Sequence, residues 1–170
     1  MWSFRTQRLE VKYLSEEDRE AVLDLLTDDQ VKKYYMLPDF TSREDAIPLF
    51  ERLKKLSLGN DCLVGGIYLN GAFIGFLNEV EIKGKSIELG YAILPQYHNY
   101  GYCTEALKGA IPYLFRHGFE EVIAGAFEEN LSSIRVMEKC GMQKLETQEE
   151  IEYRGSVRRC VYYSRKRKPS

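Results

Sequence analysis

The sequence predicts an α+β fold in which helices flank a mixed, mostly antiparallel central sheet. Two apolar, strand-like runs surround Asn70-Gly71, which is a strong signal for a β-hairpin. After Pro95, strand-like and helix-like segments alternate. A second hairpin pattern, with its turn near Arg154-Gly155, follows them. Together these features give the predicted element order βααβββαβαββ.

Each predicted element rests on a local pattern. Residues 8–14 alternate in polarity as a half-buried strand does. Ser15 supplies a helix cap before a run of acidic residues, and Thr41 or Ser42 opens a second helix. Gly141 is a typical residue for ending the last helix. The other expected elements are strands over residues 62–69, 72–80 and 86–94, a helix over 101–116, a strand over 121–127, a helix over 132–140 and a hairpin over 144–164.

Composition limits the class of protein. Hydrophobic residues make up 44% of the 170, enough for one core, so we expect a single domain over residues 1–170 with a basic tail over 165–170. The net charge of −2 gives no driving force for binding nucleic acid. No apolar run reaches the roughly 20 residues that span a bilayer, and the first residues lack the apolar stretch of a secretory signal. These features favour a cytoplasmic protein without a membrane partner.

The cysteines and histidines predict neither a disulfide framework nor a metal site. The four cysteines contain no C-x-x-C pair, and the two histidines stand far apart in the sequence. We therefore expect four reduced thiols, which mostly fill the core, and no bound metal.

The most informative segment is a strand–loop–helix junction over residues 87–106. Pro95 ends the strand, a polar loop follows, and Gly101 opens the helix. The first turn of a helix offers backbone N–H groups and a partial positive charge, so it can receive a phosphate or pyrophosphate. An ordinary junction without a ligand is the alternative interpretation. The nucleotide-binding patterns G-x-x-x-x-G-K-(S/T) and G-x-G-x-x-G are both absent.

This junction resembles the GNAT superfamily of N-acetyltransferases. Residues 96–101, Gln-Tyr-His-Asn-Tyr-Gly, are similar to its acetyl-CoA signature (R/Q)-x-x-G-x-(G/A), with Asn99 at the first glycine. Asn tolerates a left-handed backbone best among non-glycine residues, so we expect the loop to close. Residues 89–91 and 102–106 are similar to the branch of ribosomal-protein N-terminal acetyltransferases, and residues 130–142 resemble the family's second conserved segment.

The resemblance implies acetyl-CoA as the co-substrate and assigns its contacts. The backbone of residues 91–93 would pair with the pantetheine arm as an added strand does. The backbone of residues 99–104 would hold the pyrophosphate. Asn130 would contact the cofactor near its reactive end, and it also fits the role of a helix cap. The implied cofactor-binding residues are Tyr91, Ala92, Ile93, Gln96, Asn99, Tyr100, Gly101, Tyr102, Cys103, Thr104 and Asn130.

Acetyl transfer to an amine requires a neutral nucleophile, so a base must remove a proton. Glu88 is the candidate base. An ion pair with a neighbouring strand is the alternative role for Glu88, and Glu79 and Glu81 are weaker candidates. Many family members use a tyrosine as the donor to the leaving thiolate, and Met137 stands at that position here. The resemblance to the N-terminal acetylating branch implies Ser133 as the donor instead.

The sequence thus predicts an acetyl-CoA-dependent N-acetyltransferase. The acceptor would be a primary amine, either a protein N-terminal α-amine or a small-molecule amine, which attacks directly in a ternary complex. A catalytically weak coenzyme A-binding regulatory module on the same fold is the alternative. A peptide- or RNA-associated module that uses the basic tail is a third hypothesis, which the near-neutral net charge disfavours. A monomer and a homodimer are both compatible with the sequence.

Overall fold

A computed structural model describes residues 1–170 and contains one eight-stranded sheet in the order β1-β2-β3-β4-β5-β6-β8-β7. Strands β5 and β6 pair in parallel, whereas the β1–β2, β2–β3, β3–β4, β6–β8 and β7–β8 pairs are antiparallel. The predicted α+β class with a mixed, mostly antiparallel sheet flanked by helices is confirmed.

The contacts of the chain divide it into two compact units. The first comprises Met1–Asn78 and Tyr91–Ala106, and the second comprises Glu79–Gly90 and Leu107–Ser170. Three elements contribute residues to both units, namely β4 (Ala72–Lys83), β5 (Ser86–Ile93) and α4 (Tyr102–Arg116). A single domain over residues 1–170 stays a prediction.

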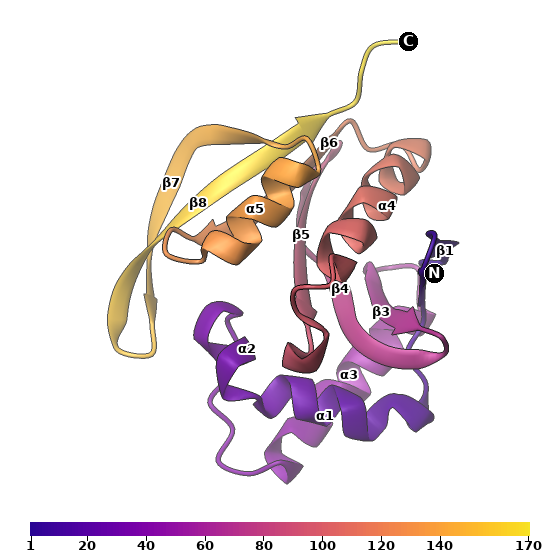
Figure 1. The fold of residues 1–170 in the computed structure, drawn as a ribbon, viewed down its shortest axis with the longest axis vertical. Coiled ribbons are helices and arrows are strands. Elements are labelled where there is room, and N and C mark those ends of the chain that lie inside the picture. Colours follow the sequence, from indigo (N-terminus) through magenta and orange to yellow (C-terminus); the bar gives the residue numbers. More distant parts are fainter. The chain divides into compact units, whose positions relative to one another are not determined.

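The first unit packs three helices around one apolar core (Figure 1). Helix α1 (Arg19–Thr27) contributes Val22, Leu25 and Leu26 at helical spacing, and α3 (Ile47–Leu58) contributes Phe50; all four side chains are fully buried. Ala92 near the end of β5 and Leu94 directly after it belong to the same core. The other elements of this unit are β1 (Phe4–Arg5), β2 (Leu9–Lys12), α1 (Arg19–Thr27), α2 (Asp29–Tyr34), α3 (Ile47–Leu58), β3 (Val64–Leu69) and the 3₁₀ turns η1 (Glu16–Asp18), η2 (Glu44–Ala46) and η3 (Pro95–Tyr97).

Two short elements of the first unit add to the predicted order. Strand β1 has only two residues, and α2 has six, so neither carries a readable period. The start of α2 nonetheless has a local signal, because the Asp28 carboxylate accepts hydrogen bonds from the N–H groups of Gln30 and Val31 at 2.9 and 3.0 Å. The hairpin signal at Asn70-Gly71 is confirmed, with φ of 50° and 83°.

A glycine of β4 permits a close approach to β5. A Cβ added to Gly75 would lie 2.3 Å from the carbonyl oxygen of Ala92, which is backbone that cannot rotate away. Directly beside this contact, the Leu94 N–H donates a hydrogen bond to the Ile74 carbonyl oxygen at 2.8 Å. Gly75 therefore fixes the position of the β5 segment for which the sequence predicts cofactor contacts.

We expect Gly75→Ala to lower the free energy of unfolding by about 1–3 kcal/mol, because the new methyl group forces β4 and β5 apart. Urea denaturation measures this loss. Gly59→Ala is the matched control, since its new Cβ would meet its nearest neighbour at an ordinary 3.5 Å. Equal midpoints for Gly75→Ala and the wild type would contradict the close approach.

The second unit contains the long C-terminal hairpin (Figure 1). Its predicted turn at Arg154-Gly155 is confirmed, with φ of 53° and 77°. The strand after the turn continues through Lys166 and pairs with β6, so Arg165 and Lys166 lie in the sheet instead of in the basic tail. The elements wholly in this unit are β6 (Glu121–Phe127), α5 (Leu131–Lys139), β7 (Gln143–Tyr153) and β8 (Ser156–Lys166).

Three further features bear on the sequence predictions. The four cysteines are free thiols, and two of them, Cys140 and Cys160, are buried. No cluster of three or more His, Cys, Asp or Glu side chains has an arrangement that would hold a metal ion. None of the helices combines the length and the apolar character that crossing a membrane requires.

Candidate active site

The strand–loop–helix junction lies in the first unit from Tyr91 onward, and a hydrogen bond within it holds the start of its loop. After β5 ends at Ile93, the 3₁₀ turn η3 leads to His98, whose Nε2 lies 2.8 Å from the Ile93 carbonyl oxygen. Asn99 and Gly101 both have left-handed backbones, with φ of 66° and 78°. The expectation that Asn99 accepts this conformation in place of glycine is confirmed.

Helix α4 begins directly after this loop. Its first backbone hydrogen bond runs from Glu105 N–H to the Gly101 carbonyl oxygen at 3.0 Å. An α-helix leaves its first N–H groups outside its own hydrogen-bond ladder, and its N-terminus carries partial positive charge. A loop with alternating left-handed residues before such a terminus forms a concave backbone surface that suits an anion.

The predicted cofactor residues of the first unit differ in exposure. Ala92 and Ile93 are buried, and Gln96, Asn99, Tyr100 and Gly101 are exposed. Tyr91, Tyr102, Cys103 and Thr104 are half-buried. The rings of Tyr100 and Tyr102 stack with their centroids 5.7 Å apart. These residues follow one another from the end of β5 through the loop into the first turn of α4.

Sequence reasoning missed the partners that hold this loop from the other end of the chain. The Glu105 carboxylate accepts hydrogen bonds from the Thr6 hydroxyl at 2.6 Å, the Arg8 backbone N–H at 2.7 Å and Arg8 Nε at 2.6 Å. Arg8 Nη1 also donates to the Tyr100 carbonyl oxygen at 3.0 Å. These residues are separated by more than 90 positions, and no local pattern in the sequence pairs them.

The second unit contains the predicted base, Glu88. This carboxylate is half-buried on β5, and no salt bridge reaches it, in contrast to the alternative of an ion pair. Burial raises the pKa of Glu88, and the nearby negative charges of Glu81 and Glu149 raise it further, while Lys83 acts in the opposite direction. A carboxyl group with a raised pKa is better matched to proton abstraction near neutral pH than an ordinary one.

The two weaker candidates for the base have different surroundings. Glu81 is exposed and forms a salt bridge with Lys83 at 2.9 Å, so its charge is compensated. Glu79 is half-buried on β4. Glu149 on β7, which the sequence did not indicate, is a negative charge that acts on Glu88. Its carboxylate accepts a hydrogen bond from the Tyr162 hydroxyl at 2.7 Å. The assignment of Glu88 as the base stays a prediction.

Asn130 and Ser133 meet at the start of α5. The Asn130 side chain accepts a hydrogen bond from the Ser133 N–H at 3.2 Å, which confirms its interpretation as a helix cap. Ser133 is half-buried. Met137 is fully buried in the same helix. The cofactor contact of Asn130 and the donor role of Ser133 stay predictions.

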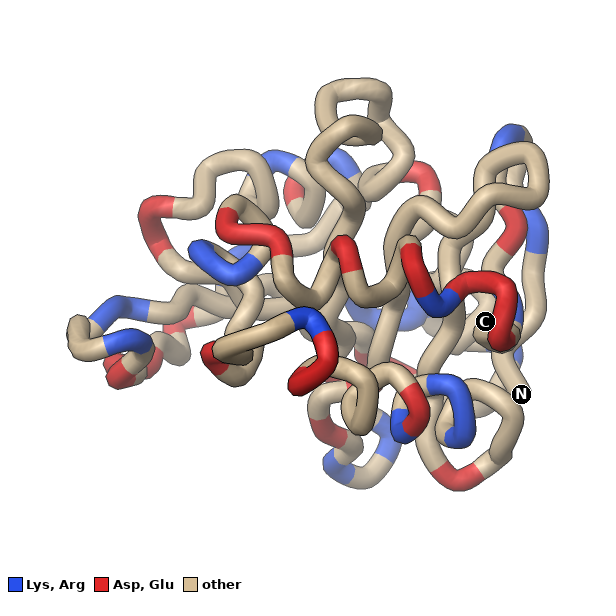
Figure 2. Tube along the Cα trace, turned by 90° about the horizontal axis from the view of Figure 1, so that it is seen from below, with Lys and Arg blue, Asp and Glu red and all other residues tan.

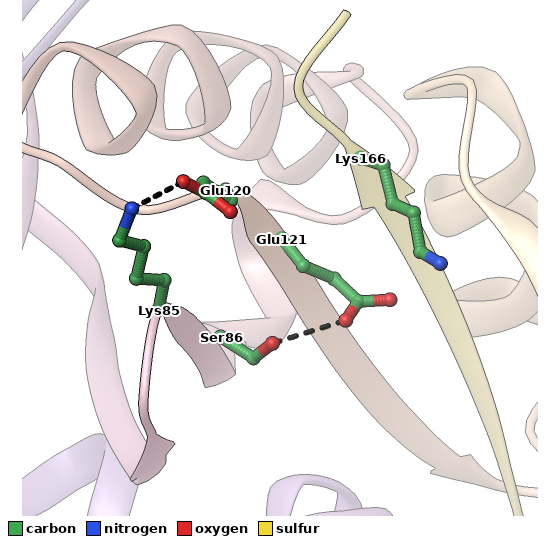
Figure 3. A pocket seen from close by; sticks show the side chains of 5 residues that line it. All are labelled: Lys85, Ser86, Glu120, Glu121 and Lys166. Carbon is green, nitrogen blue, oxygen red and sulfur yellow. Dashed lines mark hydrogen bonds and ion pairs between the residues drawn. The ribbon is translucent and has the colours of Figure 1, made fainter.

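A surface pocket of the second unit contains none of the predicted site residues, although Ser86 stands two positions before Glu88 on β5. It is lined by Lys85, Ser86, Glu120, Glu121 and Lys166 (Figure 3). Lys85 pairs with Glu120 at 2.5 Å, and Ser86 donates to Glu121 at 3.0 Å. Figure 2 shows the same mixture of acidic and basic residues along the rest of the chain, in keeping with the net charge of −2.

Fold and sequence together define the family. The sequence pattern described as "Acetyltransferase (GNAT) domain" matches residues 8–143, so the chain belongs to the GNAT acetyltransferases. It is 28% identical over 145 residues to the uncharacterized N-acetyltransferase YoaA of Bacillus subtilis (strain 168), covering 82% of this chain and 81% of that protein. The predicted membership of the GNAT superfamily is confirmed, and acetyl-CoA use is implied by the family.

Solved structures share the fold over nearly the whole chain. A GNAT-family acetyltransferase from Bacillus anthracis has a TM-score of 0.84 and 26% sequence identity, with 97% of this chain and 98% of that chain covered. The ribosomal L7/L12 α-N-protein acetyltransferase RimL, solved in complex with coenzyme A, has a TM-score of 0.85 at 17% identity, with 97% and 98% covered. The second likeness is one of fold.

Proposed function

We propose that this acetyltransferase transfers the acetyl group of acetyl-CoA to a primary amine, by direct attack in a ternary complex. The observation that carries the proposal is the loop of residues 99–101, whose left-handed residues lead into the N-terminus of α4. Acetyl-CoA would supply the activated thioester and the acceptor would supply the attacking amine. The residues of this chain would bind and orient both and move the proton.

The residues of the loop fit a coenzyme A pyrophosphate. Backbone N–H groups at the start of α4 suit its charge, and Gly101 presents no side chain on the loop surface. The backbone of residues 91–93 would align the pantetheine arm, and the Thr104 hydroxyl would add one donor to the pyrophosphate. The contacts assigned to Gln96, Tyr100, Tyr102, Cys103 and Asn130 are part of the same proposal.

Glu88 would remove the proton from the acceptor amine. Most of an alkylamine is protonated at neutral pH, since its pKa is about 10. The raised pKa of Glu88, which burial and the charges of Glu81 and Glu149 produce, brings this carboxyl group closer to the amine in proton affinity. Ser133 would donate a proton toward the leaving thiolate.

The acceptor class in this proposal is either a protein N-terminal α-amine or a small-molecule amine. RimL, whose name assigns it to the α-amine of ribosomal L7/L12, shares only the fold, so it does not distinguish the two. We propose a cytoplasmic enzyme that acts as a monomer or a homodimer and needs neither a metal nor a nucleic acid.

We expect acetyl-CoA to stabilise the protein against thermal unfolding. A ligand present at about 100 times its dissociation constant adds about 2.7 kcal/mol to the free energy of unfolding. A thermal shift assay with acetyl-CoA measures this, followed by release of free coenzyme A in the presence of a panel of amines. A shift without release for any amine would favour the regulatory module, and no shift at millimolar acetyl-CoA would remove the proposal.

A further inference from the structure

The N-terminal segment of the first unit contacts the candidate pyrophosphate loop through Arg8. Its guanidinium group donates from Nε to Glu105 and from Nη1 to the carbonyl oxygen of Tyr100. It also lies over the ring of Tyr102, 4.6 Å from the ring centroid. The loop and the first turn of α4 are therefore tied to one side chain, at three different residues.

A carboxylate in the first turn of α4 presents an electrostatic problem for the proposed ligand. Burial acts to raise the pKa of Glu105, but hydrogen bonds from Thr6 and Arg8 outweigh it and lower that pKa below its ordinary value. Glu105 is thus negatively charged at neutral pH, in the helical turn that would receive a doubly charged pyrophosphate. Like charges repel each other, more strongly where water is partly excluded, so an uncompensated Glu105 carboxylate would repel a pyrophosphate bound at this turn.

We infer that Arg8 is a positioning residue for coenzyme A, because it neutralises Glu105 and fixes the backbone of the Asn99–Gly101 loop. This inference rests on the proposed use of acetyl-CoA. The side chain of Glu105 is only 17% exposed and that of Arg8 is 42% exposed, so water screens this pair less than the Arg5–Glu10 pair, whose side chains are 80% and 32% exposed. Arg8 Nη2 lies 3.5 Å from the position that a Cβ on Gly101 would take, beside the loop surface.

The geometry assigns separate tasks to the three groups. Thr6 and the Arg8 backbone N–H hold the Glu105 carboxylate in place. The guanidinium group of Arg8 neutralises the Glu105 carboxylate and donates a hydrogen bond to the carbonyl oxygen of Tyr100. Tyr100 is the residue directly after the left-handed Asn99. Loss of Arg8 would leave an uncompensated carboxylate beside the ligand and a loop with one anchor fewer.

The test compares four variants in acetyl-CoA binding and steady-state kinetics. Hydrogen bonds to charged groups contribute more free energy than those between neutral groups. We therefore expect Arg8→Ala to raise the KM for acetyl-CoA about 10- to 100-fold, with kcat within about twofold of the wild type. Affinity for S-acetylpantetheine, which lacks the pyrophosphate, should not change. Arg5→Ala is the matched control, because Arg5 pairs with Glu10 on the same segment with its side chain 80% exposed, and its KM should equal that of the wild type.

The double variant Arg8→Ala/Glu105→Gln separates charge neutralisation from simple loss of packing. If the bare carboxylate repels the ligand, removing it should recover part of the affinity lost in Arg8→Ala, and Glu105→Gln alone should bind nearly as well as the wild type. A double variant that binds no better than Arg8→Ala would overturn the inference, as would an unchanged KM in Arg8→Ala. Failure of the wild type to bind acetyl-CoA would instead remove the proposed function.

Discussion

Replacement of Glu88 by glutamine should reduce turnover by about 10²–10⁴-fold, the usual contribution of a positioned general base. Affinity for acetyl-CoA should persist, because the proposed cofactor contacts on β5 are made by its backbone. The loss should be greatest below the pKa of the acceptor amine and shrink above it, where the amine is already neutral. Rate profiles against pH for both proteins, with one amine, measure this. Full activity in a folded Glu88→Gln variant would eliminate Glu88 as the base.

The same substitution gives an independent check of the raised pKa. A carboxyl group whose pKa is higher in the folded than in the unfolded protein favours folding when protonated, and this contribution is lost as the pH rises through the folded pKa. Above that pH, Glu88→Gln should therefore be at least as stable as the wild type, since it removes a half-buried charge beside Glu81 and Glu149. A large loss of stability in the variant at neutral pH would indicate a structural role instead.

Gly101→Val should abolish the thermal shift caused by acetyl-CoA. Gly101 has φ of 78°, and a β-branched side chain is strongly disfavoured there, so the loop must change its backbone. The new side chain would also approach Arg8 Nη2, which lies 3.5 Å from the Cβ position. Titration with acetyl-CoA, followed by thermal unfolding or calorimetry, measures the loss of binding.

Gly118→Val is the matched control for Gly101→Val. It introduces the same side chain at φ of 97°, where nothing lies within 4 Å of the new Cβ. Both variants should lose about 1–2 kcal/mol of stability from backbone strain, yet only Gly101→Val should lose the ligand. Retention of a full acetyl-CoA shift by Gly101→Val would show that the loop does not receive the pyrophosphate.

Features that depend on neighbouring residues could be predicted from the sequence. The turns at Asn70-Gly71 and Arg154-Gly155, the cap at Asn130 and the left-handed Asn99 all follow from the conformational preferences of one or two residues. The longer helices and strands could also be predicted, because their apolar residues repeat over several turns or pleats. Strand β1 and helix α2 could not be predicted in this way, since a repeat cannot be recognised in so few residues.

The sequence by itself therefore determined the fold class, the family and the loop that marks the candidate coenzyme A site. Only the tertiary structure decided which distant groups act on that loop and on the candidate base. Arg8 reaches Glu105 across 97 positions, and Glu149 reaches the surroundings of Glu88 through the strand order of the sheet. Burial and the field of distant charges set the proton affinity of a carboxyl group, and neither exists until the strands have paired.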